Sequence, residues 1–106
     1  ITIGNTIGLA AFCNFNGTGT PAIRRAGNVS SITDYGLGSY GLNFITPMVD
    51  ANYTVLGLTS RGDDSNVSIM IDESNPPTTT QVRIRTGTPS QGYYSDRPYI
   101  SIGVIS

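Results

Sequence analysis

Tyrosines and charged side chains gather near the carboxyl end of the sequence in a combination that suits sugar binding. Tyr93, Tyr94, Asp96 and Arg97 stand almost next to one another, and Tyr99 follows. Tyrosine rings offer flat faces to the C–H face of a sugar, while carboxylate and guanidinium groups hydrogen-bond to hydroxyls. In the alternative interpretation, Asp96 and Arg97 form an ion pair that stiffens a loop, and each tyrosine packs with its hydroxyl in water.

A second polar loop, residues 59–66, carries the sequence Arg61-Gly62-Asp63. This tripeptide is the one that animal integrins recognise, and a polar loop would leave it accessible. A match of three residues arises easily by chance in a chain of this composition, so integrin binding is not expected. Arg61, Asp63 and the following Asp64 nevertheless belong to the candidate ligand contacts.

The acidic residues and the single cysteine do not assemble a catalytic or metal site. Asp63, Asp64, Asp72 and Glu73 could offer oxygen ligands to Ca²⁺, but they lack the spacing of a known calcium loop, and solvated turn carboxylates are the simpler interpretation. A pair such as Asp63 and Asp72 could in principle hydrolyse a glycan, yet nothing in the sequence positions it. Histidine is absent, and Cys13 lies in a predicted strand as a buried apolar side chain. We expect no catalytic residues, no metal and no cofactor.

Composition excludes several classes of partner. The chain has 106 residues, of which 12% are charged, and its net charge is −1. It contains no basic stripe that could displace counterions from phosphates, so a nucleic-acid partner is not expected. Membrane insertion is not expected either, because no apolar run is long enough to span a bilayer. The length fits one domain, and so few charges favour contact with other subunits.

Short apolar stretches with a two-residue period run along the chain, separated by Gly, Pro, Asn and Ser. The clearest lies in a hairpin, where Tyr40, Leu42 and Phe44 occupy alternate positions after a turn bracketed by Gly36 and Gly38. Strands are expected at 9–15, at 22–25, on both sides of the 35–39 turn, and at 53–58, 67–72, 81–86 and 99–105. This pattern is typical of an antiparallel sandwich or barrel. We expect an all-β fold, a β-sandwich of about seven or eight short strands without significant helix.

Several motifs resemble the carboxy-terminal domain of phage tail fibre proteins, especially a module of cyanophage-type tail fibres. They are Asn14-Phe15-Asn16-Gly17-Thr18-Gly19, the run of residues 28–34, Asn43-Phe44 with Pro47-Met48, and Ala51-Asn52-Tyr53. The strand at 99–105 is also similar to the last strand of that module, whereas the rest of the second half matches weakly. Two positions depart from the family: it often has Trp where Phe12 stands, and commonly Asn-Gly where this chain has Tyr35-Gly36.

The resemblance implies a homotrimeric tip at the distal end of a tail fibre on the virion, which attaches the phage to its bacterial host. Its partner would be a surface polysaccharide or an outer-membrane component. Residues 9–106 would form the tip domain and residues 1–8 an extended lead-in from the fibre shaft. For residues 1–8, an edge strand or a disordered terminus is the alternative. For the function, the alternative is a structural cap that trimerises the fibre and binds no ligand of its own.

Ligand binding is expected in the loops, because loops on a rigid scaffold tolerate changes of sequence and length. If the strands run up and down, loops 16–20, 35–39, 59–66 and 87–97 share one end of the molecule, opposite the point where the chain begins. The candidate ligand contacts lie in three of these loops and are Tyr35, Arg61, Asp63, Asp64, Tyr93, Tyr94, Asp96 and Arg97.

Overall fold

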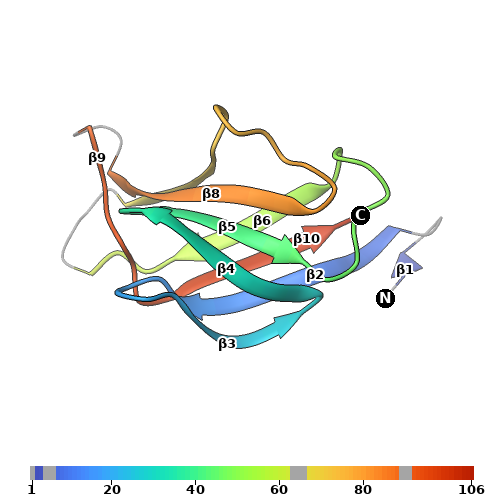
Figure 1. The fold of residues 1–106 in the computed structure, drawn as a ribbon, viewed down its shortest axis with the longest axis horizontal. Helices are drawn as coiled ribbons and strands as arrows, with labels where there is room; N and C mark the ends of the chain where they lie inside the picture. The colour runs from blue at the N-terminus through green and yellow to red at the C-terminus, as the bar shows by residue number, and fades with distance from the viewer. Residues whose placement is uncertain (1, 4–6, 63–66, 89–91) are drawn as a thin grey trace.

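The computed structural model describes residues 2–3, 7–62, 67–88 and 92–106. Their strands form two five-stranded antiparallel sheets that face each other (Figure 1). Among these residues there is no helix, and so none that could cross a membrane. The expected all-β fold with two packed antiparallel sheets is confirmed, and every expected strand has a counterpart.

The first sheet, called sheet I, has β2 (Ile7–Asn16) and β10 (Ile100–Ile105) at its centre. β6 (Thr54–Thr59) pairs with the free side of β10, and β3 (Ala22–Gly27) pairs with the free side of β2. The two-residue strand β1 (Thr2–Ile3) pairs with the first residues of β2. At this end of the sheet Gly8 and Ser106 also exchange two backbone hydrogen bonds of 3.0 Å, which tie the last residue of the chain to β2.

The second sheet, called sheet II, has β5 (Ser39–Phe44) and β8 (Gln81–Thr88) at its centre. β4 (Val29–Gly36) flanks β5, and β7 (Ser68–Ile71) flanks β8. The short β9 (Tyr93–Tyr94) pairs with the last two residues of β8, beyond the beginning of β5. The expectation that 87–97 is one long loop is therefore wrong, because this segment folds back on β8.

The chain crosses from sheet I to sheet II at Asn28, the single residue between β3 and β4. Its φ of 55° lies in the left-handed region, which Asn tolerates better than most residues. The side-chain amide donates to the carbonyls of Ala10 and Thr46 at 3.1 and 3.0 Å, and its oxygen accepts from the N–H of Thr46 at 2.7 Å. These hydrogen bonds of Asn28 fix one sheet against the other.

Alternate residues of the central strands fill the space between the sheets. Phe15 of β2 and Tyr40 of β5 meet edge to face there, with ring centroids 5.3 Å apart. Tyr40, Leu42 and Phe44, which alternate in the expected hairpin, are buried there together with Val82, Ile84, Ile100, Ile102 and Val104. Cys13 is buried among them as expected, and burial raises the pKa of its thiol to about 11.

The expectation of a solvated turn carboxylate is wrong for Asp72, which is only 6% exposed. β7 ends at Ile71, one residue before Asp72, and the chain then turns back over the carboxylate of Asp72. The oxygen Oδ1 accepts from the backbone N–H of Ser74 at 3.1 Å, and Oδ2 accepts from the side-chain amide of Asn75 at 3.2 Å. Both oxygens of Asp72 are thus used inside its own turn.

Candidate functional site

Four loops meet at one end of the sandwich, at the left of Figure 1 and away from β1. Three hydrogen bonds join them. The N–H of Gly17 donates to the carbonyl of Arg97 at 2.9 Å, and the N–H of Gly38 donates to Oδ1 of Asp96 at 2.8 Å. Nη1 of Arg97 donates to the backbone carbonyl of Arg61 at 2.7 Å. The described parts of loops 16–20, 35–39, 59–66 and 87–97 therefore cluster as expected.

The side chain of Asp96 stands at the centre of this cluster, which we call the loop junction (Gly17, Gly38, Tyr40, Asp96 and Arg97). The buried hydroxyl of Tyr40 lies 2.9 Å from Oδ1 of Asp96 and 2.9 Å from the carbonyl of Gly17, so two acceptors share its proton. Burial raises the pKa of Tyr40 well above its ordinary value of 10.0, and the hydrogen bond to Asp96 raises it further. A core tyrosine thus anchors the loops through a carboxylate.

Space for the Tyr40 hydroxyl exists because residue 17 is glycine. A Cβ at Gly17 would lie 2.4 Å from the hydroxyl oxygen, closer than side chains approach. At Gly38, φ is +62° and a Cβ would lie 2.3 Å from the carbonyl oxygen of Thr86, so this position also requires glycine. Both glycines are needed for the loops to approach Tyr40 and β8 this closely.

Two of the predicted ligand contacts, Asp96 and Arg97, therefore hold the loops together. Asp96 accepts from Gly38 and Tyr40, while Arg97 donates from Nε to the carbonyl of Asp96 at 2.9 Å and from Nη1 to Arg61. These contacts stiffen the loops through backbone groups, which differs in detail from the ion pair considered above. The predicted contacts Asp63 and Asp64 lie outside the described residues.

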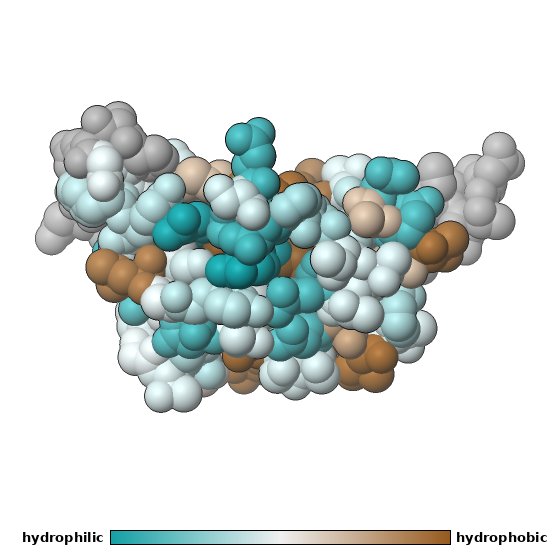
Figure 2. Space-filling view, turned by 45° about the horizontal axis from the view of Figure 1, so that its top comes forward, coloured by the Kyte–Doolittle hydropathy of each residue, from teal (hydrophilic) through white to brown (hydrophobic). Residues whose placement is uncertain are grey.

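Two other predicted contacts, Tyr35 and Tyr94, lie against arginines of β8. The guanidinium of Arg83 stands 3.6 Å from the centroid of the Tyr35 ring, and that of Arg85 stands 3.8 Å from the centroid of Tyr94. We call these four residues the arginine–tyrosine face. Seen with the top of Figure 1 turned forward, hydrophilic residues gather across the middle of the surface and hydrophobic ones mostly toward its edges (Figure 2).

The strand pattern explains why this face forms. Because Val82 and Ile84 point into the core, Arg83 and Arg85 project from the outer side of sheet II. Tyr35 reaches Arg83 across Gly41, where a Cβ would lie 2.7 Å from the tyrosine ring. The pairing of β9 with the end of β8 brings Tyr94 to Arg85 in the same way. The face thus depends on one glycine and on one short strand.

Arg83 and Arg85 are not among the ligand contacts predicted from the sequence. A signal for them is present, since their alternation with Val82 and Ile84 indicates that they point outward. Their partners could not be read from the sequence, because each tyrosine arrives from a separate strand.

Tyr93, the remaining predicted contact, is 45% exposed on β9.

No family model, curated protein or solved structure matches this chain. Within the described part of the chain, no group of three or more acidic or cysteine side chains is placed to hold a metal ion.

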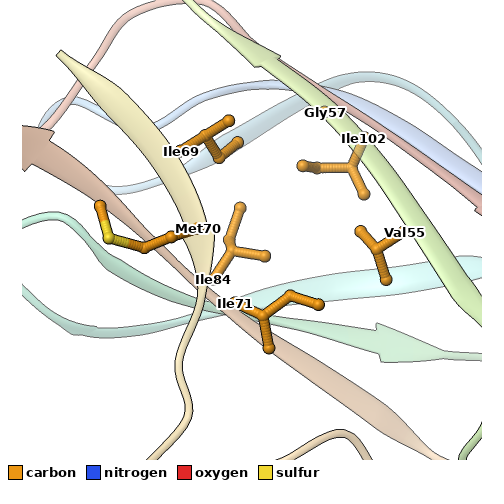
Figure 3. A pocket seen from close by; sticks show the side chains of 7 residues that line it. All are labelled: Val55, Gly57, Ile69, Met70, Ile71, Ile84 and Ile102. Carbon is orange, nitrogen blue, oxygen red and sulfur yellow. The ribbon is translucent and has the colours of Figure 1, made fainter.

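A small cavity opens between the sheets where β6 and β7 lie opposite each other (Figure 3). Its volume is about 80 Å³, and its lining is apolar: Val55, Gly57, Ile69, Met70, Ile71, Ile84 and Ile102. Most of these side chains point into the gap, whereas that of Met70 points away. A cavity lined by apolar side chains cannot orient a sugar or support acid–base chemistry, so it is a packing gap between two edge strands that do not pair with each other.

Proposed function

We propose that this chain is the receptor-binding tip domain of a phage tail fibre, which attaches the virion to a saccharide on the surface of its bacterial host. The motifs that resemble tail fibre tips support the class. The binding surface comprises the clustered loops and the adjoining arginine–tyrosine face, with Tyr35, Tyr93 and Tyr94 as sugar contacts.

The observation that carries the proposal is the clustering of four loops at one end of a rigid sandwich. Hydrogen bonds between the described parts of these loops hold those parts in position, so that less ordering cost remains to be met there when a ligand binds. The tyrosines around this end add flat rings with polar edges, and such rings supply much contact area at low entropic cost. Loops of this kind can vary in sequence while the sandwich beneath them stays the same.

The test is a binding assay of the purified chain on host-range panels of bacteria and on an array of bacterial polysaccharides. We expect binding to one group of strains and to a saccharide of that group. Tyr93→Ala and Tyr94→Ala should each weaken binding about tenfold, since an aromatic contact contributes on the order of 1 kcal/mol or more. Val49→Ala is the control, because Val49 is an exposed apolar residue in the loop that follows β5, away from the clustered loops.

The structural cap is the second candidate, and the outer side of sheet I favours it. Leu56 and Phe12 flank Gly103 on its two sides, while Leu9 and Leu58 extend the same apolar surface. Exposed apolar patches of this kind are typical of contacts between subunits. In the proposed homotrimer this surface would be buried, and the cap would act without a ligand.

Sedimentation analysis tests the trimer separately from ligand binding. We expect the chain to sediment as a trimer and Leu58→Glu to dissociate it, because a charge would be placed in an apolar contact. A chain that sediments as a monomer at every concentration would contradict the trimer. If the chain is trimeric but binds no cell and no saccharide, the cap replaces the receptor-binding tip as the function.

A further inference from the structure

The arginine–tyrosine face holds two guanidinium groups with unused hydrogen-bond donors. Arg83 and Arg85 lie two residues apart on β8, so they are about 7 Å apart along the strand. Each guanidinium is fixed by its stacking on a tyrosine ring, which occupies a face of the group and leaves its edge for hydrogen bonds. The pair therefore forms a pre-oriented row of N–H donors.

The donors nearest the sheet lack acceptors. The Nε atoms of Arg83 and Arg85 are both buried, and neither has a hydrogen-bond partner among the described residues. Buried donors in proteins are nearly always paired, because an unpaired one has lost its hydrogen bonds to water without a replacement. Two such atoms on neighbouring outward positions show that the described residues leave donors of both guanidinium groups unpaired.

Asp72 is a carboxylate that lies near Arg83, and it does not serve as an acceptor for the unpaired donors. Its Oδ2 lies 4.0 Å from Nη2 of Arg83, which is too long for a hydrogen bond. Its two oxygens already accept from Ser74 and Asn75 in the turn after β7. The positive charge of the two arginines is consequently compensated only in part.

Polar groups beside the arginines suit sugar hydroxyls. Gln81 donates from its amide nitrogen to Oδ1 of Asn43 at 2.8 Å and to the hydroxyl of Tyr35 at 3.0 Å. Asn43 in turn donates to the hydroxyl of Thr33 at 2.8 Å. A row of amides and hydroxyls therefore continues from the arginines across β5 to β4, and Tyr35 at its edge is 44% exposed.

We propose that this face binds an anionic saccharide, with Arg83 and Arg85 holding its carboxylate or phosphate groups and the Gln81–Asn43 row contacting its hydroxyls. Guanidinium groups bind such oxyanions through paired N–H donors, which lysine cannot present. This inference rests on the proposed function and adds the charge of the ligand to it. A neutral saccharide could accept hydrogen bonds through its hydroxyls, but only an anionic one also compensates the positive charge of the two guanidinium groups.

The experiment uses the same array of bacterial polysaccharides with chemical pairs added. Each uronate-containing polymer is printed beside its carboxyl-reduced form, and each phosphate-containing polymer beside its dephosphorylated form. We expect the chain to bind at least one acidic polymer at least tenfold better than its neutral pair. The pair that shows the difference identifies carboxylate or phosphate as the source of the charge.

Charge-matched variants assign the effect to the two arginines. Arg83→Gln and Arg85→Gln should each remove the preference for the acidic form. Arg24→Gln is the matched control, because Arg24 also stacks on a tyrosine, Tyr99, but belongs to sheet I. Circular dichroism at several temperatures confirms that each variant is folded. In the folded wild type, the Nε–H proton resonances of Arg83 and Arg85 should shift on addition of the acidic polymer.

The outcomes separate this inference from the proposed function. Equal binding to acidic and neutral forms, or binding that survives both Gln substitutions, would overturn the anionic ligand while leaving saccharide binding intact. Binding to no saccharide at all would overturn both. Loss of binding in Arg24→Gln to the same degree as in the β8 variants would show a general effect of net charge and would also overturn the assignment.

Discussion

The loop junction and the arginine–tyrosine face use the same kinds of residue in opposite ways. At the junction, the carboxylate of Asp96 accepts from Gly38 and Tyr40, and the proton of the Tyr40 hydroxyl is shared with the carbonyl of Gly17. On the face, the guanidinium groups stack on rings and their Nε atoms have no acceptor. The hydrogen bonds at the junction are made within the fold, whereas the face leaves guanidinium donors unpaired.

The largest effect on stability is expected from removing the carboxylate at the junction. Asp96→Ala leaves the buried Tyr40 hydroxyl and the N–H of Gly38 without this acceptor, which should lower the free energy of unfolding by about 3 kcal/mol. Asp96→Asn keeps an oxygen in the same place and should cost clearly less. Urea unfolding measures both, with Glu73→Ala as an exposed carboxylate control. Equal effects of Asp96→Ala and Glu73→Ala would show that the junction is not a structural centre.

The second largest effect on stability is expected at alkaline pH, which should weaken the loop junction. Because the pKa of Tyr40 is raised in the folded state, its contribution is complete below the unfolded value of 10.0 and is lost as the pH rises toward the folded pKa. A single group of this kind changes the free energy of unfolding by at most about 1.4 kcal/mol per pH unit. Urea midpoints between pH 9 and 11.5 should therefore fall less steeply in Tyr40→Phe than in the wild type.

Two other buried groups also lower the free energy of unfolding at alkaline pH. They are present in both the wild type and Tyr40→Phe, so the difference between the two proteins does not include them. Burial raises the pKa of Cys13 from 9.0 to about 11 and that of Tyr53 from 10.0 to about 12. Their contributions remain in Tyr40→Phe, so some pH dependence persists in the variant. Identical slopes in the two proteins would mean that Tyr40 ionises as easily in the folded chain as in the unfolded chain.

The sequence predicts the sandwich and the meeting of the loops because both follow from the spacing of apolar residues and turns. It does not predict the role of Asp96, since the donors that bind it come from Gly38 and Tyr40, which are distant in sequence. The burial of Asp72 is missed for a related reason. Alternation indicates only the side of a strand to which a residue points, and a turn such as that at Ser74 can still cover it.

A moderate effect is expected from filling the space under Tyr35. In Gly41→Ala, the new Cβ would lie 2.5 Å from Nε2 of Gln81 and 2.7 Å from the Tyr35 ring. Both neighbours are ends of side chains that can move, so the cost should be about 1 kcal/mol while Tyr35 leaves Arg83. Val49→Ala is again the control, because Val49 is exposed in the loop after β5 and lies outside both the arginine–tyrosine face and the apolar surface of sheet I. Saccharide binding should fall only in Gly41→Ala, and a fall in both variants would contradict the role of Gly41.

The smallest effect on stability, yet a large one on binding, is expected from Arg83→Gln. Its guanidinium contributes a stacking contact of about 0.5–1 kcal/mol, but the same substitution also removes a buried donor that has no partner. These terms have opposite signs, so the free energy of unfolding should change by less than about 1 kcal/mol. If urea unfolding instead shows a loss as large as that of Asp96→Ala, Arg83 supports the fold as the junction does, and the contrast between the two regions fails.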